Sequence, residues 1–227
     1  MSISKKAKEF DKNGEYMRKI DNALELLKQF RQKYPFKDNP ESIDSLTADD
    51  LFKENPPRIG DFFRWIQFKL KPLGHLSVYS NAYRNARNQL EDFKALLHVV
   101  VDEEKSLAEK VDAPWEKIKR LGGDKHLAKK IIYCYNNDVL PIFSTADLEI
   151  LFRLLMDRQN LPSKYYGMSP GKQYEFLNRA LLSLKEGCAE TKHWDNAYFM
   201  WFLYVTYKWR KPSQHACMHT RENVCGG

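Results

Sequence analysis

The sequence lacks any long run of apolar residues. None of its hydrophobic stretches approaches the roughly 20 residues that a membrane-spanning helix needs. The first ten residues, MSISKKAKEF, contain no apolar segment typical of a signal peptide. Cysteine is also scarce, and Cys134, Cys188, Cys217 and Cys225 do not have the spacing of a disulfide framework. These absences predict a cytoplasmic protein with reduced thiols and no membrane partner.

The motifs of common enzymes are missing as well. The sequence contains no glycine-rich phosphate loop, no Gly-x-Ser-x-Gly elbow and no His-Glu-x-x-His pair. Without a Walker A sequence, the chain is not a nucleotide-hydrolysing ring subunit of the common kind. Helix-turn-helix spacing and zinc-finger patterns are not evident either. We therefore expect a protein that is not an enzyme and that carries no cofactor.

What the sequence does contain is a sizeable core and an excess of positive charge. Its 227 residues are 43% hydrophobic, enough for one or two domains. Lys and Arg number 37 against 30 Asp and Glu, so the net charge is +7. Such an excess is compatible with a polyanionic partner, and equally with a solvated basic surface.

Helical periodicity extends along most of the chain, and no strand–turn–strand pattern is evident. The fold class we expect is all-α, a multi-helix globular bundle with mainly orthogonal packing and no substantial sheet. Residues 194–207 are apolar almost all round and predict a central buried helix. The expected helices cover residues 2–33, 58–71, 78–111, 115–121, 124–135, 146–158, 170–186 and 194–207.

Residues 38–57 are acidic and are interrupted by Pro40, Pro56 and Pro57, which is typical of a connector. Thr47 and Asp50 predict a short capped helix within it. We therefore expect an N-terminal helix and acidic connector over residues 1–57, a helical core domain over 58–211, and an irregular tail over 212–227.

Basic side chains predict a nucleic-acid-binding surface. The stretch 114–130 is rich in lysine, and the helix that holds Arg84 and Arg87 also carries asparagines suited to phosphate and base-edge contacts. The alternative is that these are only the solvated faces of amphipathic helices. The candidate nucleic-acid-binding residues are Arg64, Arg84, Arg87, Lys117, Lys119, Arg120, Lys125, Lys129 and Lys130, and Lys69 and Lys71 extend the surface if the fold brings them close.

Three other groups of residues suggest a metal site or a catalytic site, each with a spacing or position that does not favour it. His215, Cys217, His219 and Cys225 could supply zinc ligands, although their spacing does not match common fingers. Asp92 with Glu103, Glu104 and Lys105 could hold Mg²⁺ in a nuclease, but these residues also fit the solvated face of a helix. His126 and Cys134 are eight residues apart on one helix, about 12 Å, which is too far for a catalytic pair.

The run DKHLAKKIIYCYNNDVLPIFSTADLEILFRLL resembles a segment that precedes the ATPase module in some McrB-like restriction AAA+ proteins. The later run WDNAYFMWFLYVTY resembles the end of that region, and together they cover about a third of the chain. The first resemblance rests on Lys129, Ile131, Tyr133, Tyr135, Leu140, Pro141, Phe143, Thr145 and Leu148.

This resemblance implies a role in recognising DNA, often methylated, next to an AAA+ ring or a nuclease partner. Our first hypothesis is thus a non-enzymatic DNA-recognition or adaptor domain of a restriction or defence system. The alternatives are a protein–protein interaction module, with Tyr165, Tyr166 or Trp209 as anchors, and a metal-dependent nuclease. The sequence leaves open whether the nucleic acid is DNA or RNA.

Overall fold

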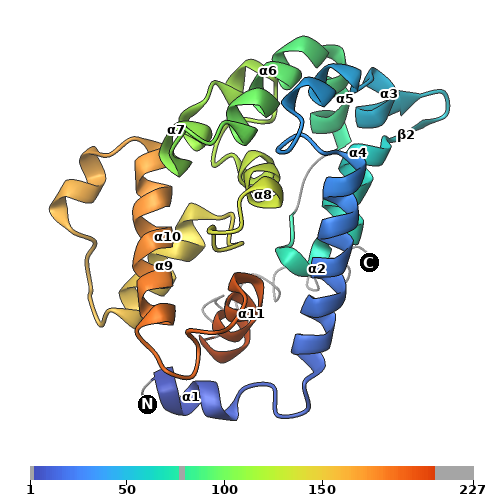
Figure 1. The fold of residues 1–227 in the computed structure, drawn as a ribbon. Coiled ribbons are helices and arrows are strands. Elements are labelled where there is room, and N and C mark those ends of the chain that lie inside the picture. Colours follow the sequence, from blue (N-terminus) through green and yellow to red (C-terminus); the bar gives the residue numbers. More distant parts are fainter. Residues whose placement is uncertain (1–2, 77–79, 208–227) are drawn as a thin grey trace, which may run out of the picture.

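The computed structural model describes residues 3–76 and 80–207. The molecule is predominantly all-α, as expected, with one small two-stranded sheet in the described part (Figure 1). In chain order the elements are α1 (Ile3–Glu9), α2 (Glu15–Lys33), η1 (Pro40–Ser45), α3 (Ala48–Leu51), β1 (Phe52–Glu54), β2 (Pro57–Ile59), α4 (Asp61–Arg64), η2 (Trp65–Lys69), η3 (Lys71–Leu73), α5 (Ser80–Asn88), α6 (Leu90–Val101), α7 (Leu107–Asp112), η4 (Trp115–Lys117), α8 (His126–Tyr135), α9 (Thr145–Leu155), η5 (Ser163–Gly167), α10 (Pro170–Glu186) and α11 (Asn196–Tyr207).

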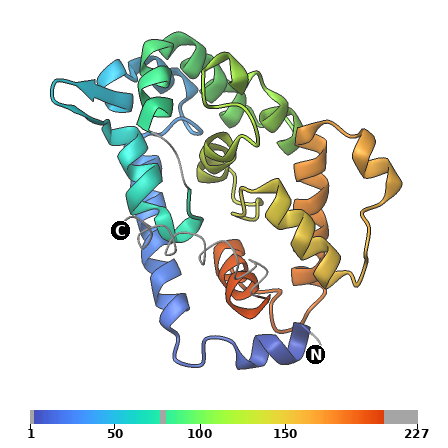
Figure 2. The ribbon, with the colours of Figure 1, turned by 180° about the vertical axis from the view of Figure 1, so that it is seen from behind.

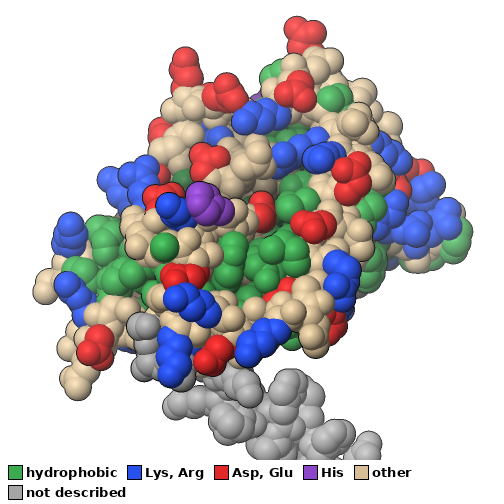
Figure 3. All heavy atoms as spheres, turned by 60° about the horizontal axis from the view of Figure 1, so that its bottom comes forward, with side chains coloured by type: hydrophobic (Ala, Val, Ile, Leu, Met, Phe, Trp, Pro, Cys, Tyr) green, Lys and Arg blue, Asp and Glu red, His purple; other side chains and the backbone are tan. Residues whose placement is uncertain are grey.

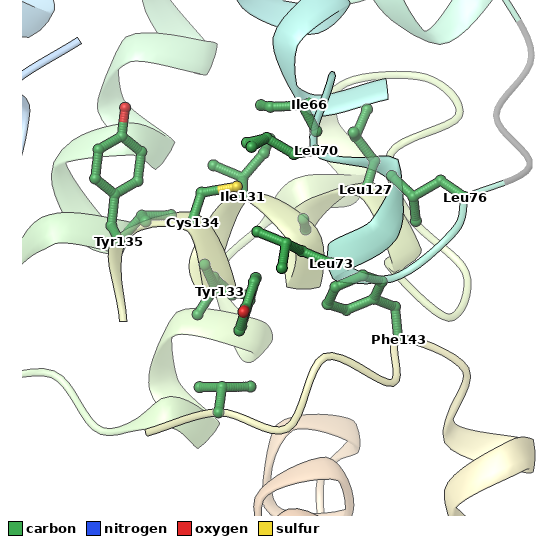
Figure 4. Packing of buried hydrophobic residues seen from close by; sticks show 14 of the residues in the cluster. Ile66, Leu70, Leu73, Leu76, Leu127, Ile131, Tyr133, Cys134, Tyr135 and Phe143 are labelled. Carbon is green, nitrogen blue, oxygen red and sulfur yellow. The ribbon is translucent and has the colours of Figure 1, made fainter. Parts of the chain in front are cut away.

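Helix α8 lies near the middle of the molecule, between α2 on one side and α10 on the opposite side (Figures 1 and 2). It contacts α2, α6, α7 and η2. All of its residues from Leu127 to Tyr135 are buried, although the sequence indicates an amphipathic helix. Figure 4 shows Leu127 and Ile131 of α8 packed near Leu70 and Leu73, which come from the end of η2 and from η3. A central helix of only ten residues therefore organises the core.

The expected helix over residues 2–33 is interrupted at Gly14, which has a left-handed φ of +64°. Glycine adopts this conformation at little cost, so the chain can turn here. The carboxylate of Asp11 then accepts hydrogen bonds from the backbone N–H groups of Tyr16 and Met17. These bonds satisfy two of the donors that the first turn of α2 leaves unpaired.

The expected helix over residues 78–111 is also divided, into α5, α6 and α7. Ser106 and Glu109 form a capping box, in which each side chain accepts a hydrogen bond from the backbone N–H of the other residue. This local arrangement favours a new helix start over continuation of α6. The β-branched run Val99 to Val101 nevertheless lies in α6, because Val100 and Val101 fill the core.

The prediction for residues 52–71 was wrong in two places. Strands β1 and β2 pair antiparallel, with Phe52 opposite Ile59 and Lys53 opposite Arg58. The expected helix from residue 58 starts only at Asp61, and its second half, η2, is a π-helix. The boundary expected between residues 57 and 58 thus falls within β2, and buried residues from both sides of it belong to one hydrophobic cluster.

The C-terminal helices agree best with the sequence. Ser144 caps α9 and Ser169 caps α10, each by accepting a backbone hydrogen bond, and Gly187 follows the end of α10. Helix α11 is only partly the buried helix that we expected, because Trp201 and Tyr204 remain half-buried. The expected tail, residues 212–227, lies outside the described residues. Among the helices of residues 3–76 and 80–207, none is both long and apolar enough to span a bilayer.

Candidate nucleic-acid interface

Two of the predicted surface lysines, Lys129 and Lys130, are buried, with relative exposures of 2% and 0%. Their assignment to a nucleic-acid surface was wrong. The Lys129 ammonium lies 2.5 Å from Oδ1 of Asp124 and 2.8 Å from Oγ1 of Thr145, and it donates to the carbonyl of Phe143. This lysine therefore ties α8 to the start of α9.

Asp124 also binds residues of both helices at the junction between α8 and α9. Its carboxylate accepts from the backbone N–H of Thr145, at 2.8 Å, and from the Thr145 hydroxyl. Burial alone would raise the pKa of Asp124, but the hydrogen bond from His126 and the Lys129 ammonium lower it well below its ordinary value. The carboxylate is thus held ionised between two helices.

Lys130 has no carboxylate partner in the described part of the chain. Its ammonium donates to the backbone carbonyls of Leu70, at 2.6 Å, and Leu73, at 3.1 Å, and to that of Gly74. It also lies 5.4 Å from the centroid of the Phe143 ring. Burial lowers the pKa of Lys130 to about 8. This residue fixes the turn that follows η2, a role that the sequence pattern did not indicate.

Arg84 and Arg87 are half-buried and secure the hairpin against α5. Arg84 pairs with Glu54 at 3.3 Å and lies over the Phe52 ring. Arg87 donates from Nε to the Phe52 carbonyl at 2.9 Å. Lys125 is engaged in a similar way, since its ammonium donates to the carbonyls of Val111 and Ala113. Their charges are therefore largely occupied by contacts within the molecule.

The remaining predicted residues are exposed. Lys117, Lys119 and Arg120 lie beside α5, because Asn85 and Gln89 donate to the carbonyls of Lys119 and Lys117. Arg64 lies apart in sequence, at the end of α4. Lys117, Lys119 and Arg120 thus form one exposed group, and Arg64 is exposed in another segment of the chain.

Around Arg64, the segment Pro57–Leu76 carries an excess of cations, among them Lys69 and Lys71. Arg64, Lys69 and Lys71 are exposed, and we call these three residues the basic segment. The acidic residue in this stretch, Asp61, pairs with Lys33 at 2.6 Å. Asp61 also lies close enough to Lys69 to interact with its charge, so one carboxylate faces two lysines and the basic segment keeps an excess of positive charge.

Lys69 and Lys71 of the basic segment line an apolar pocket of about 600 Å³ between the η2–η3 region, α2 and α11. Phe68, Met200, Trp201 and Tyr204 supply its apolar lining. Phe68 is 60% exposed, and the Trp201 indole N–H donates to the carbonyl of Pro72 at 2.8 Å. Figure 3 looks onto the side of the molecule where α1 and α11 lie, and hydrophobic side chains gather there among charged ones. Lys19, Lys69, Lys71, Pro72, Gly74 and His75 complete the lining.

Sequence reasoning missed this pocket, although one signal was present. The apolar stripe of the expected helix contained Ile59, Phe62, Phe63, Ile66 and Leu70. Phe68 falls off that stripe, between the polar residues Gln67 and Lys69. This position off the stripe is the one signal in the sequence that predicts an exposed aromatic side chain here.

The other candidate sites gain no support from the geometry. Asp92 is exposed on α6, whereas Glu103 lies beyond the end of that helix and pairs with Lys37. Within the described ranges, no group of three or more His, Cys, Asp and Glu side chains is placed to hold a metal ion. Cys134 is fully buried, and burial raises the pKa of its thiol to about 11. His215, Cys217, His219 and Cys225 lie outside the described residues.

Comparisons with known proteins give no match to a protein family, a curated protein or a solved structure.

Proposed function

We propose that this chain is a non-enzymatic nucleic-acid recognition or adaptor module. The observation that carries the proposal is the basic segment of three exposed cations, two of which, Lys69 and Lys71, line a pocket that also contains aromatic side chains. Phosphate binding needs exposed cations, and unpaired bases stack on aromatic rings. Lys117, Lys119 and Arg120 form a second contact region beside α5. The resemblance to McrB-like proteins adds a DNA target and an AAA+ ring or nuclease partner to this proposal.

Binding to fluorescent single strands and duplexes over a salt series tests the proposal. Because lysine and arginine release counterions from phosphates, affinity should fall steeply as salt rises. Plain and methylated duplexes belong in the same series, since the McrB-like resemblance implies a methylated target. If none of these ligands binds at low salt, the proposal is refuted. Under that condition the attraction between phosphates and a chain of net charge +7 is strongest.

A second candidate function is protein–protein interaction. Ile150 and Leu154, one turn apart on α9, are 37% and 52% exposed, and Tyr166 is 66% exposed. Exposed apolar side chains of this kind favour a partner surface. Of the anchors considered in the sequence, Tyr165 is buried and Trp209 lies outside the described residues. Replacing Ile150 and Leu154 by serine, which adds no charge, should abolish a protein complex while leaving nucleic-acid affinity unchanged.

A further inference from the structure

The pocket beside the basic segment is built from rigid parts. The indole N–H of Trp201 donates to the Pro72 carbonyl, and the ring stacks on Tyr16 with centroids 5.1 Å apart. From the core, the Lys130 ammonium donates to the carbonyls of Leu70 and Gly74, which lie on either side of Pro72 in the chain. These bonds fix the backbone of the pocket rim from the core and from α11, so the pocket exists before a ligand arrives.

The π-helical turn places Phe68 at the mouth of this pocket. The backbone N–H of Leu70 donates to the carbonyl of Trp65 at 2.9 Å, which closes the wider turn. π-Helical turns are rare in proteins, and those that occur often lie at functional sites. Here the turn keeps Trp65 and Ile66 in the core while Phe68 remains 60% exposed. Packing in the core does not explain why an aromatic residue stands at this exposed position, but contact with a ligand would explain it.

The charged side chains that line the pocket have one sign. Lys19, Lys69 and Lys71 contribute ammonium groups, and no Asp or Glu is found among the described residues that line it. Lys19 already pairs with Glu15, and Lys69 lies 3.5 Å from the centroid of the Trp65 ring. Lys71 is exposed and has no ion pair with any described residue. An apolar pocket of this size with cations at its rim suits a flat ring that carries a phosphate.

From these observations we propose that the pocket binds an unpaired nucleotide of a single-stranded nucleic acid. The base packs against Phe68 and Trp201, and the neighbouring phosphates lie against Lys69 and Lys71. Bases stack on aromatic side chains whatever their sequence, because every base has a π-face. This inference rests on the proposed function, and it adds that the preferred ligand is a single strand.

The test compares three ligands: a thymidine oligonucleotide of about twelve nucleotides, the same backbone without bases, which has the same charge, and a duplex of the same length. The full chain should bind the thymidine strand about tenfold more tightly than the abasic strand. Phe68→Ala should remove most of this difference and leave abasic and duplex binding unchanged. Phe68→Trp should restore it.

Tyr166→Ala is the matched control, because Tyr166 is a similarly exposed aromatic residue on η5, outside the pocket. It should leave all three affinities unchanged. Equal binding of thymidine and abasic strands by the wild type, or unchanged thymidine binding after Phe68→Ala, would overturn the inference while the proposed function stands. Absence of binding to all three ligands would overturn both.

Discussion

At the scale of single residues, two adjacent lysines show how a charged side chain can be structural. In sequence, Lys129 and Lys130 belong to a basic amphipathic helix and suggest a surface. In the structure both ammonium groups are buried, one paired with Asp124 and the other enclosed by backbone carbonyls. A buried ammonium is costly unless it is hydrogen-bonded, and the carbonyls of the 70–74 turn supply those bonds.

Lys130→Met should lower the free energy of unfolding by about 2–4 kcal/mol, because three buried carbonyls lose their donor. Urea unfolding at neutral pH measures this loss. Lys28→Met is the control, since the Lys28 side chain is 71% exposed, and it should change stability by no more than about 0.5 kcal/mol. A similar, small effect of both substitutions would show that the carbonyls do not depend on Lys130.

Asp124 gives the stability a pH dependence of known sign. Its pKa in the folded chain is lower than the ordinary value of 3.8, so the carboxylate stabilises the fold above that value. The contribution is lost as the pH falls below it towards the lower pKa of the folded state. Asp124→Asn should therefore cost about 1 kcal/mol at neutral pH, a modest value because solvent screens a side chain that is more than a third exposed.

The measurement for Asp124 is the difference in unfolding free energy between wild type and Asp124→Asn at about pH 7 and about pH 3. We expect the difference to shrink at the lower pH. A difference that grows on acidification would contradict the assignment of Asp124 as an ionised group at the α8–α9 junction.

At the scale of elements, the sequence was most informative where local signals and burial agree. Ser169 and Gly187 mark the ends of α10 in both the sequence and the structure. The hairpin was missed because its strands have only three residues each and Pro57 opens the second one. Such strands are too short to show an alternating pattern, and their position depends on Arg84 and Arg87, which are distant in sequence.

The pocket and the π-helical turn were beyond the reach of local patterns for a related reason. The pocket joins residues of η2 and η3 to residues of α11, more than a hundred positions later. The π-helical turn also depends on α8, because the Lys130 ammonium donates to the carbonyl of Leu70, where the turn ends. Periodicity identifies which residues of a helix are buried, but it does not say which distant helix meets them.

Gly74 should be the most sensitive glycine of this region. It has a φ of +98°, and an added Cβ would collide with the Phe143 ring and lie 2.7 Å from the Pro141 carbonyl. We expect Gly74→Ala to lower the free energy of unfolding by about 2 kcal/mol or more. Gly123→Ala is the matched control, because Gly123 also has a positive φ, +67°, but no atom within 4 Å of an added Cβ.

Thermal unfolding of the two variants separates crowding from backbone strain. Gly123→Ala should cost about 1 kcal/mol from strain alone. If the two alanine variants were equally stable, the packing of Phe143 against the 70–74 turn would be refuted.

At the scale of the whole molecule, burial and internal contacts leave only some of the basic side chains available to a ligand. Of the nine cations first assigned to a binding surface, Lys129 and Lys130 are internal, and Arg84, Arg87 and Lys125 are engaged by neighbouring groups. Arg64, Lys117, Lys119 and Arg120 remain exposed, and Arg64 belongs to the basic segment, whose Lys69 and Lys71 lie at the rim of the aromatic pocket. The proposed function therefore depends on where the exposed cations are, and the net charge of +7 alone does not support it.

The most direct test of this account compares two charge reversals in the full chain. One variant changes Arg64, Lys69 and Lys71 to Glu. The other changes Lys164, Lys172 and Lys192, which are exposed and lie outside the basic segment and the pocket, and so has the same net charge. Affinity for a fluorescent single strand is measured over a salt series.

We predict that reversal of the basic segment weakens binding at least about tenfold and makes the salt slope shallower by about 2, as expected for three lost phosphate contacts. Reversal of Lys164, Lys172 and Lys192 should have a much smaller effect. Equal losses in the two variants would mean that only net charge matters, and that result would contradict the assignment of the basic segment as the binding site.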